Sequence, residues 1–280
     1  MIQRYSRPEM RAIWTDENKL RIWLQIELLA SEALVREGVV PRKDFAKIKA
    51  GCEKWLADLP ARVERLSFRV ICGPTGSGKT RLLHALAAAG AQVLDLEALA
   101  RHRASVLGAI PGVSQPSQKH FETQVWDTVR ALDAARPVYV EAESRKVGNL
   151  TLPESLVAAM RASACLRVDL SQDERVALLL EDYPFFVSNP AFFCERLDAL
   201  VTLRGRAVVE GWKTQIAAGH TEAVVRELLE KHYDPGYATS TRRNFSQFEH
   251  ALAVAPSDRS QAAFDRASAQ ILAAEAPVLR

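Results

Sequence analysis

One eight-residue stretch constrains the fold more than any other part of the sequence. It fills every fixed position of the pattern G-x-x-x-x-G-K-[ST] and consists of Gly73, Pro74, Thr75, Gly76, Ser77, Gly78, Lys79 and Thr80. Residues 68–72 are typical of a buried strand that enters this stretch, and residues 81–89 of a helix that leaves it. A strand, a glycine-rich loop and a helix in this order form a cradle whose backbone N–H groups and helix N-terminus face an anion.

The residue types in this loop predict the ligand. We expect its backbone to bind a di- or triphosphate, Lys79 to reach the outer phosphates and the Thr80 hydroxyl to hold Mg²⁺. The pattern predicts a ligand class and no particular reaction, because the same loop supports many chemistries.

Composition excludes several classes of protein. The chain has 280 residues with 48% hydrophobic and 25% charged side chains, which is ordinary for a globular protein, and its net charge of +3 is too small to indicate nucleic-acid binding. No apolar run approaches the ~20 residues that span a bilayer, and the N-terminus lacks a secretory signal. We therefore expect no membrane association and a cytoplasmic location.

Four cysteines are widely spaced: Cys52, Cys72, Cys165 and Cys194. Without a C-x-x-C pair, neither zinc nor a redox dithiol is expected. Cys72 and Cys165 lie in apolar, strand-like runs and are predicted to be buried thiols, as in a reducing compartment.

Strand and helix patterns alternate after residue 67. Strands are predicted at 68–72, 92–96, 137–141 and 166–170, with helices after Ser117 and Pro153. This alternation predicts an α/β fold, a P-loop NTPase-like parallel sheet flanked by helices. We divide the chain into a helical segment at 1–66, the α/β core at 67–175 and a mostly helical region at 176–280 that packs on the core. Residues 232–237 are predicted to form a turn.

Three acidic residues lie at or just after the ends of predicted strands. Asp95 could position a metal or act as a base, or it could cap the next helix, and the two interpretations are equally supported. Glu141 and Glu143 end the third strand at the carboxyl edge, where such sheets bind ligands. One of them could orient Mg²⁺ through water, or both could pair with Arg145 and Lys146.

An ordered set of motifs resembles a known family. The phosphate loop is followed by Leu94-Asp95-Leu96-Glu97, His102-Arg103-Ala104-Ser105, Gln115-Pro116-Ser117-Gln118-Lys119, Glu141-Ala142-Glu143-Ser144-Arg145-Lys146, Gly148-Asn149 and His232-Tyr233-Asp234-Pro235. Over about residues 60–270 the chain resembles the C-terminal half of tRNA 2-selenouridine synthase. Glycine would be expected where Ala104 stands.

The resemblance implies an activity. The family replaces sulfur by selenium at the 2-position of a wobble uridine, with selenophosphate as selenium donor and an S-geranylated intermediate formed from geranyl diphosphate. Catalytic roles would fall to Lys79, Asp95, Glu141 and Glu143. The cofactors would be Mg²⁺ with geranyl diphosphate or a nucleoside triphosphate.

The resemblance also implies tRNA as a partner. Residues of the motifs and of a later basic pair are the candidates for tRNA contacts: His102, Arg103, Gln115, Lys119, Arg145, Lys146, Arg242 and Arg243. Arg242 and Arg243 lie near Tyr237 and Phe245, so they could grip single-stranded RNA, although the start of a surface helix is nearly as plausible. The aromatic cluster Phe185, Phe186, Phe192 and Phe193 is expected in the core, with a slot for a lipid chain as the alternative.

The N-terminal segment resembles a different family. Arg4-Tyr5-Ser6-Arg7-Pro8-Glu9-Met10, Ile13-Trp14 and Asp16-Glu17-Asn18-Lys19 are similar to the opening of adenylosuccinate lyase, over about residues 1–50. The rhodanese-like domain with which the synthase family normally begins is not expected here. We therefore expect a fusion with its seam between Ala50 and Phe68, no lyase activity, loss of selenation and retention of geranyl transfer as a possibility to test.

Two other functions remain open. The loop alone would allow an ATP-dependent small-molecule or nucleoside kinase. The chain could also be a non-catalytic fusion whose N-terminal helices drive homo-oligomerisation, because their wide apolar faces must be covered by something.

Overall fold

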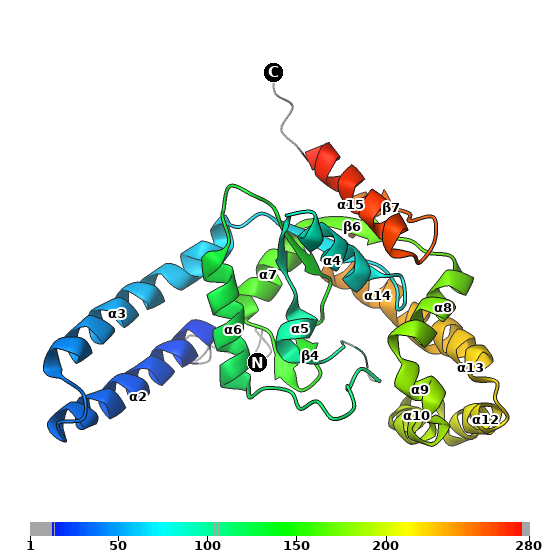
Figure 1. Cartoon of the computed structure of the whole chain (residues 1–280), viewed down its shortest axis with the longest axis horizontal. Helices are drawn as coiled ribbons and strands as arrows, with labels where there is room; N and C mark the ends of the chain where they lie inside the picture. The colour runs from blue at the N-terminus through cyan, green and yellow to red at the C-terminus, as the bar shows by residue number, and fades with distance from the viewer. Residues whose placement is uncertain (1–12, 14, 104, 106, 276–280) are drawn as a thin grey trace.

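The structure is a computed structural model that describes residue 13, residues 15–103, residue 105 and residues 107–275 (Figure 1). Predictions that concern Arg4, Tyr5 and Ala104 lie outside these residues.

A five-stranded parallel sheet forms the centre of the molecule. Its order is β2-β3-β1-β6-β7, and the strands are β1 (Phe68–Cys72), β2 (Gln92–Leu94), β3 (Val138–Glu141), β6 (Ala164–Val168) and β7 (Leu252–Val254). Strand β1 lies in the middle, so the loop that follows it opens at the centre of the carboxyl edge. The predicted α/β fold of the P-loop NTPase-like type is confirmed.

Helices cover both faces of the sheet. Ile71 faces α4 (Lys79–Ala88) and α15 (Gln261–Glu275), and these elements share one apolar cluster with Phe264 at its centre. Val70 points to the other face, which is covered by α5 (Leu96–Ala100), α6 (Gln118–Ala131) and α7 (Glu154–Ala162). This opposite orientation of neighbouring residues follows from the alternation of side chains along a strand.

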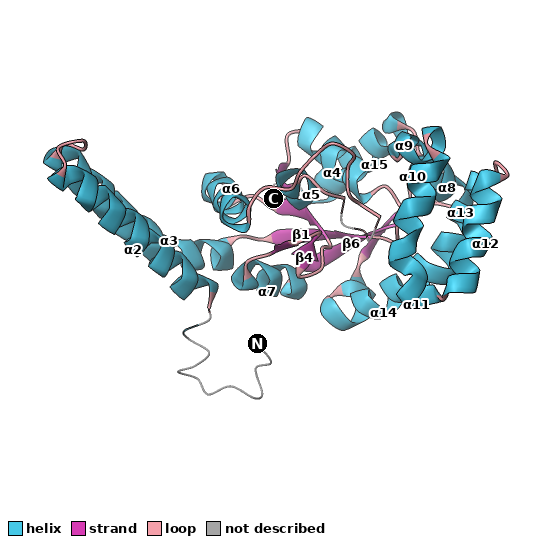
Figure 2. Cartoon of the chain, turned by 90° about the horizontal axis from the view of Figure 1, so that it is seen from below, coloured by secondary structure: helices cyan, strands magenta, loops and turns pink. Residues whose placement is uncertain are grey.

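Helices dominate the rest of the described chain. Between β6 and β7 lie α8 (Gln172–Asp182), α9 (Pro184–Ser188), α10 (Pro190–Leu197), η2 (Asp198–Leu200), α11 (Val201–Arg204), α12 (Arg206–Ala217), α13 (Thr221–Leu228), η3 (Leu229–Tyr233), α14 (Asp234–Asn244) and η4 (Phe248–His250). Helices α9 to α13 enclose an apolar core of their own around Phe193 and Trp212, beside the sheet (Figure 2).

Four predictions about elements were wrong. The strand expected at residues 166–170 lies two residues earlier, as β6. Residues 232–237 are helical, as the end of η3 and the start of α14, because Pro235 lies in the first turn of α14, where a missing N–H costs nothing. Strand β7 lies in the region expected to be helical. Strand β2 ends two residues early, because Asp95 caps α5 instead of continuing the strand.

An antiparallel helical hairpin projects from the body. Helices α2 (Asp16–Arg36) and α3 (Arg42–Arg65) pack on each other, and α3 also contacts α6 and α7 (Figures 1 and 2). Lys19 on α2 pairs with the buried Glu122 on α6 at 2.5 Å. Over the described residues, no helix has both the length and the apolar character needed to cross a bilayer.

Candidate phosphate-binding site and adjoining pockets

The glycine-rich loop has the backbone that its sequence requires. Gly76 and Gly78 have φ values of 77° and 85°, which side chains rarely tolerate, and Gly78 is the N-cap of α4. A Cβ atom at Gly78 would lie 2.3 Å from the Phe264 ring of α15. The Lys79 Nζ donates to the Gly73 carbonyl oxygen at 2.9 Å, so this side chain folds back over the loop. The first turn of α4 therefore presents its N–H groups at the loop.

Two side chains from later in the chain fix the loop in place. Arg175 on α8 is buried and donates to the Thr75 carbonyl oxygen at 2.9 and 2.7 Å, and also to both carboxylate oxygens of Asp234 at 3.0 and 2.6 Å. The Gly73 N–H donates to the Tyr237 hydroxyl at 2.5 Å. Sequence reasoning did not identify Arg175, because nothing in the local pattern of α8 marks it. Asp234 was visible only as part of a motif.

A cluster of three glutamates lies at the edge of the sheet beside the loop. Carboxylate oxygens of Glu97, Glu141 and Glu143 lie within 4.8 Å of one another, and Glu141 and Glu143 are buried. The Oε1 atom of Glu141 is buried without a hydrogen-bond partner. Sequence analysis had proposed Glu141 and Glu143 but not Glu97, although its place two residues after Asp95 was a usable signal.

The electrostatics of the cluster favour a cation. Burial raises the pKa of Glu141 to about 8 and Glu97 adds to this effect, whereas Lys79 and a hydrogen bond with Thr80 act in the opposite direction. Burial, with the charges of Glu97 and Glu141, also raises the pKa of Glu143 well above its usual range. Carboxylates that resist ionisation in this way are stabilised by a bound cation. Carboxylate and hydroxyl oxygens are ligands that Mg²⁺ prefers, so Thr80, Glu141 and Glu143 fit a magnesium ion.

The two alternatives for the acidic residues can now be compared. The Asp95 carboxylate caps α5 by accepting from the Ala98 N–H at 2.8 Å, and its other oxygen lies 2.9 Å from the His84 ring. Asp95 thus has the capping role. For the glutamates, Arg145 and Lys146 are exposed, and in the part of the chain that the structure describes no ion pair joins them to Glu141 or Glu143.

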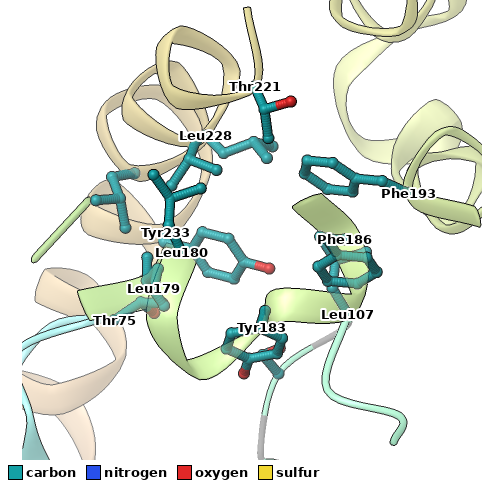
Figure 3. A pocket seen from close by; sticks show the side chains of 13 residues that line it. Thr75, Leu107, Leu179, Leu180, Tyr183, Phe186, Phe193, Thr221, Leu228 and Tyr233 are labelled. Atoms are coloured by element: carbon teal, nitrogen blue, oxygen red, sulfur yellow. The ribbon is translucent and has the colours of Figure 1, made fainter. Parts of the chain in front are cut away.

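An apolar pocket adjoins the loop. It encloses roughly 490 Å³ of space, part of it open solvent (Figure 3). It lies between the loop and the helices that connect β6 to β7. Thr75 lies at one end, and the walls include Leu179, Tyr183, Phe186 and Phe193. Of the predicted aromatic cluster, Phe186 and Phe193 therefore have two roles, because they pack in the helical core and also line this pocket.

Three of the predicted RNA-binding residues come together. His102, Gln115 and Lys146 line one groove. The Gln115 amide is used by the protein itself: its Nε2 donates to the carbonyl oxygens of Ala100 and Val147 at 3.2 and 3.0 Å, and its Oε1 accepts from the Asn149 N–H at 2.8 Å.

The other predicted RNA contacts lie elsewhere. The Arg103 guanidinium stacks 4.7 Å from the centre of the Tyr183 ring and lies 3.8 Å from Asp182. Lys119 pairs with Glu27 on α2, and Arg242 pairs with Glu249 at 3.0 Å. Arg145 and Arg243 are exposed, the latter on α14. The structure thus gathers part of the predicted set and leaves these five residues outside the groove.

The sheet order and the loop between β1 and α4 define a P-loop NTPase-like α/β protein. Comparison with known proteins narrows the class. Residues 66–198 match the family described as the tRNA 2-selenouridine synthase AAA domain, which confirms the resemblance seen in the sequence.

Curated relatives agree with this assignment. The tRNA 2-selenouridine synthase of Nitrosomonas europaea is 44% identical over 200 residues, which cover 66% of this chain and 51% of the relative. That of Aeromonas salmonicida is 33% identical over 198 residues, which cover 61% of this chain and 52% of the relative. The chain thus spans about half the length of these relatives. A separate 44-residue stretch is 61% identical to adenylosuccinate lyase of Bacillus subtilis and covers 16% of this chain and 10% of the lyase.

Proposed function

We propose that this chain transfers the prenyl group of geranyl diphosphate to the sulfur of a 2-thiouridine in tRNA. One observation carries the proposal: the phosphate loop opens both onto the buried glutamates and onto an apolar pocket that Thr75 lines. A ligand with a diphosphate head and a hydrocarbon tail matches this pair of environments. A nucleoside triphosphate matches it less well, because a ribose and a base carry polar groups and the pocket is lined mainly by apolar side chains. The tRNA substrate follows from the names of the relatives.

The residues of the loop would act on the leaving group. Backbone N–H groups at the start of α4 and the Lys79 ammonium would bind the diphosphate oxygens. Thr80, Glu141 and Glu143 would hold Mg²⁺, which neutralises charge on the leaving diphosphate when bound. Sulfur attacks the first carbon of the prenyl chain, the carbon–oxygen bond breaks with its electron pair leaving on the diphosphate, and the N3 proton of the thiouridine is released to water. Because negative charge grows on the diphosphate, Lys79 stabilises the transition state more than the substrate.

The tail would lie in the apolar pocket, whose walls exclude water. Tyr183, Phe186 and Phe193 supply aromatic surface there, and Leu179 closes the side next to the loop. Apolar burial contributes about 0.8 kcal/mol per CH₂ group, so the tail would add several kcal/mol to binding.

A direct assay tests the proposal. The chain is incubated with Mg²⁺, geranyl diphosphate and tRNA containing 2-thiouridine, and the tRNA mass is measured. We expect one prenyl addition, and about 100-fold or more slower addition by Lys79→Ala, as when a donor to a developing negative charge is removed. No mass gain with the unmodified chain would refute the transfer. Phosphate release from ATP that depends on Lys79 would instead favour the kinase hypothesis.

We further propose that this chain does not exchange sulfur for selenium. The neighbouring Cys165 and burial both raise the pKa of the Cys72 thiol, and burial raises that of Cys194; the hydrogen bond with Cys72 lowers the pKa of Cys165, but that thiol is buried and out of reach of a substrate. A thiol that stays protonated is a poor nucleophile, so Cys72 and Cys194 are unsuited to carry selenium. Selenium entering the tRNA from selenophosphate would contradict this expectation.

A further inference from the structure

The groove lined by His102 and Gln115 lies outside the proposed diphosphate site and could bind a ligand of its own. It lies between the hairpin of β4 (Lys146–Val147) and β5 (Leu150–Thr151) and the helix α10, which contributes Arg196. Its volume of roughly 860 Å³ lies toward the upper end of the ~300–1,000 Å³ typical of ligand sites, and the groove is open to solvent. An open groove of this size has room for a nucleotide and lets a longer ligand continue past its ends.

The charge of the groove has one sign. Lys146 and Arg196 carry its charge, the other lining residues including His102 are uncharged near pH 7, and no aspartate or glutamate is among the described side chains of its wall. Most other basic side chains around the site are neutralised, as Arg103 is by Asp182 and Arg175 by Asp234. A groove that keeps unneutralised positive charge is suited to a polyanion.

Two buried nitrogen atoms in its wall have no partner. The Nδ1 of His102 and the Nε of Arg196 are both inaccessible to solvent and make no hydrogen bond within the described chain. Burial lowers the pKa of His102 and so favours its neutral ring, whereas a hydrogen bond with the Arg103 backbone acts in the opposite direction. Buried polar groups without partners are costly, and a ligand that pairs with them recovers this cost.

The groove is continuous with the proposed reaction site. Ser105 lines both the groove and the apolar pocket, and Ser144, another wall residue, follows the buried Glu143 directly. A chain that lies along the groove would thus bring one of its units to the first carbon of a prenyl tail held in the pocket.

We propose that this groove binds a single-stranded segment of RNA, with Arg196 and Lys146 on its phosphates and His102 on the nucleotide next to Ser105. The inference rests on the proposed function for the choice of polyanion. Single-stranded RNA is favoured over a duplex, because an unstacked nucleotide exposes the base edge that chemistry at a base requires.

RNA binding is measured by fluorescence anisotropy with an anticodon stem-loop that carries 2-thiouridine. We expect Arg196→Gln and His102→Ala each to weaken binding about tenfold, as the loss of one charged or buried hydrogen bond predicts. Lys146→Ala, an exposed position on a hairpin that leaves folding intact, should also weaken binding and lower its salt dependence. Arg266→Ala, at an exposed position of α15, is the matched control and should bind like the unmodified chain.

Binding of geranyl diphosphate is measured in parallel by calorimetry, and it should be unchanged in all these variants. RNA binding that is unaffected by the three groove variants would overturn the groove assignment and leave the proposed function standing. If the unmodified chain does not bind geranyl diphosphate, the proposed function is overturned and the groove assignment still stands. If polyglutamate displaces the labelled RNA as well as unlabelled RNA does, the groove recognises negative charge alone. That result would overturn the RNA assignment.

Discussion

At the scale of single residues, the buried carboxylate of Glu141 gives the clearest prediction. Its pKa of about 8 lies above the ordinary 4.5, so the folded protein keeps a proton that the unfolded chain has lost. Without metal, the free energy of unfolding should therefore fall as pH rises from about 4.5 to about 8. Glu141→Gln cannot ionise, and we expect it to raise the melting temperature at pH 8 and to reduce the slope with pH.

Magnesium provides the complementary measurement. Added Mg²⁺ should raise the melting temperature of the unmodified chain at pH 8 but have little effect on Glu141→Gln, because the ion binds the folded state through this carboxylate. Glu222→Gln changes an exposed glutamate on α13 and should leave both responses unaltered. If the free energy of unfolding changes with pH equally in Glu141→Gln and in Glu222→Gln, Glu141 does not hold its proton in the folded state.

Arg175 is predicted to position the loop without touching the ligand. Arg175→Ala leaves the Thr75 carbonyl and Asp234 without a partner, and we expect a loss of about 3 kcal/mol in the free energy of unfolding. Arg175→Lys keeps the charge but cannot donate to both groups in the same forked geometry. It should therefore weaken geranyl diphosphate binding about tenfold with a smaller loss of stability. Equal binding by Arg175→Lys and the unmodified chain would limit Arg175 to a structural role.

Residues differ in how well the sequence predicts them. Lys79 and Thr80 could be predicted because loop, cap and helix are consecutive, so local rules fix their geometry. Arg175 and Arg196 could not, because each reaches its site through contacts between elements far apart in the chain, whereas Glu97 had a local signal in its place two residues after Asp95. The sequence placed Arg103 and Lys119 among RNA contacts, but their neutralisation by Asp182 and Glu27 depends on tertiary packing.

At the scale of elements, the β4–β5 hairpin depends on a glycine. Gly148 has a φ of 60°, and a Cβ atom there would lie 2.4 Å from the Gln115 Oε1 atom that holds the hairpin. Gly148→Ala should therefore cost about 1–3 kcal/mol in the free energy of unfolding, since it adds backbone strain and displaces a hydrogen-bonded amide.

A second glycine offers a matched control for thermal unfolding. Gly211 lies in the middle of α12 at an exposed position, and a Cβ there would meet nothing within 4 Å. Gly211→Ala should stabilise the protein by up to about 1 kcal/mol, because alanine favours the helix. If both alanine variants shift the melting temperature in the same direction, contact with Gln115 does not determine the effect at Gly148.

Elements with strong local patterns were predicted well. Helix α6 begins where Ser117 was expected to cap it, and that side chain accepts from the His120 N–H at 3.2 Å. Strand β7 has only three residues, too few for a recognisable alternating pattern, and it pairs because β6 offers an edge. Such a strand is specified by the sheet and not by its own sequence.

At the scale of the whole molecule, the α2–α3 hairpin exposes apolar side chains along its length. Ile26 and Leu29 on α2 are 57% and 58% exposed, and Val39 between the helices is 67% exposed. Lys19 and Glu27 hold α2 against α6, so the hairpin is anchored at its base while its outer face stays open to solvent. A helical surface with this much apolar area tends to become covered by a partner.

We propose that a second copy of the chain covers this surface. Light scattering at increasing concentration should then show self-association, and the double variant Ile26→Glu, Leu29→Glu should shift the protein to the monomer, because charged side chains resist burial at an interface. Val187→Glu, Leu203→Glu changes two exposed apolar positions on the body, 49% and 62% exposed, and should associate like the unmodified chain. A monomer at every concentration tested would refute the assembly, whereas a monomeric double variant that still modifies tRNA would show that the hairpin assembles the protein without contributing to its reaction.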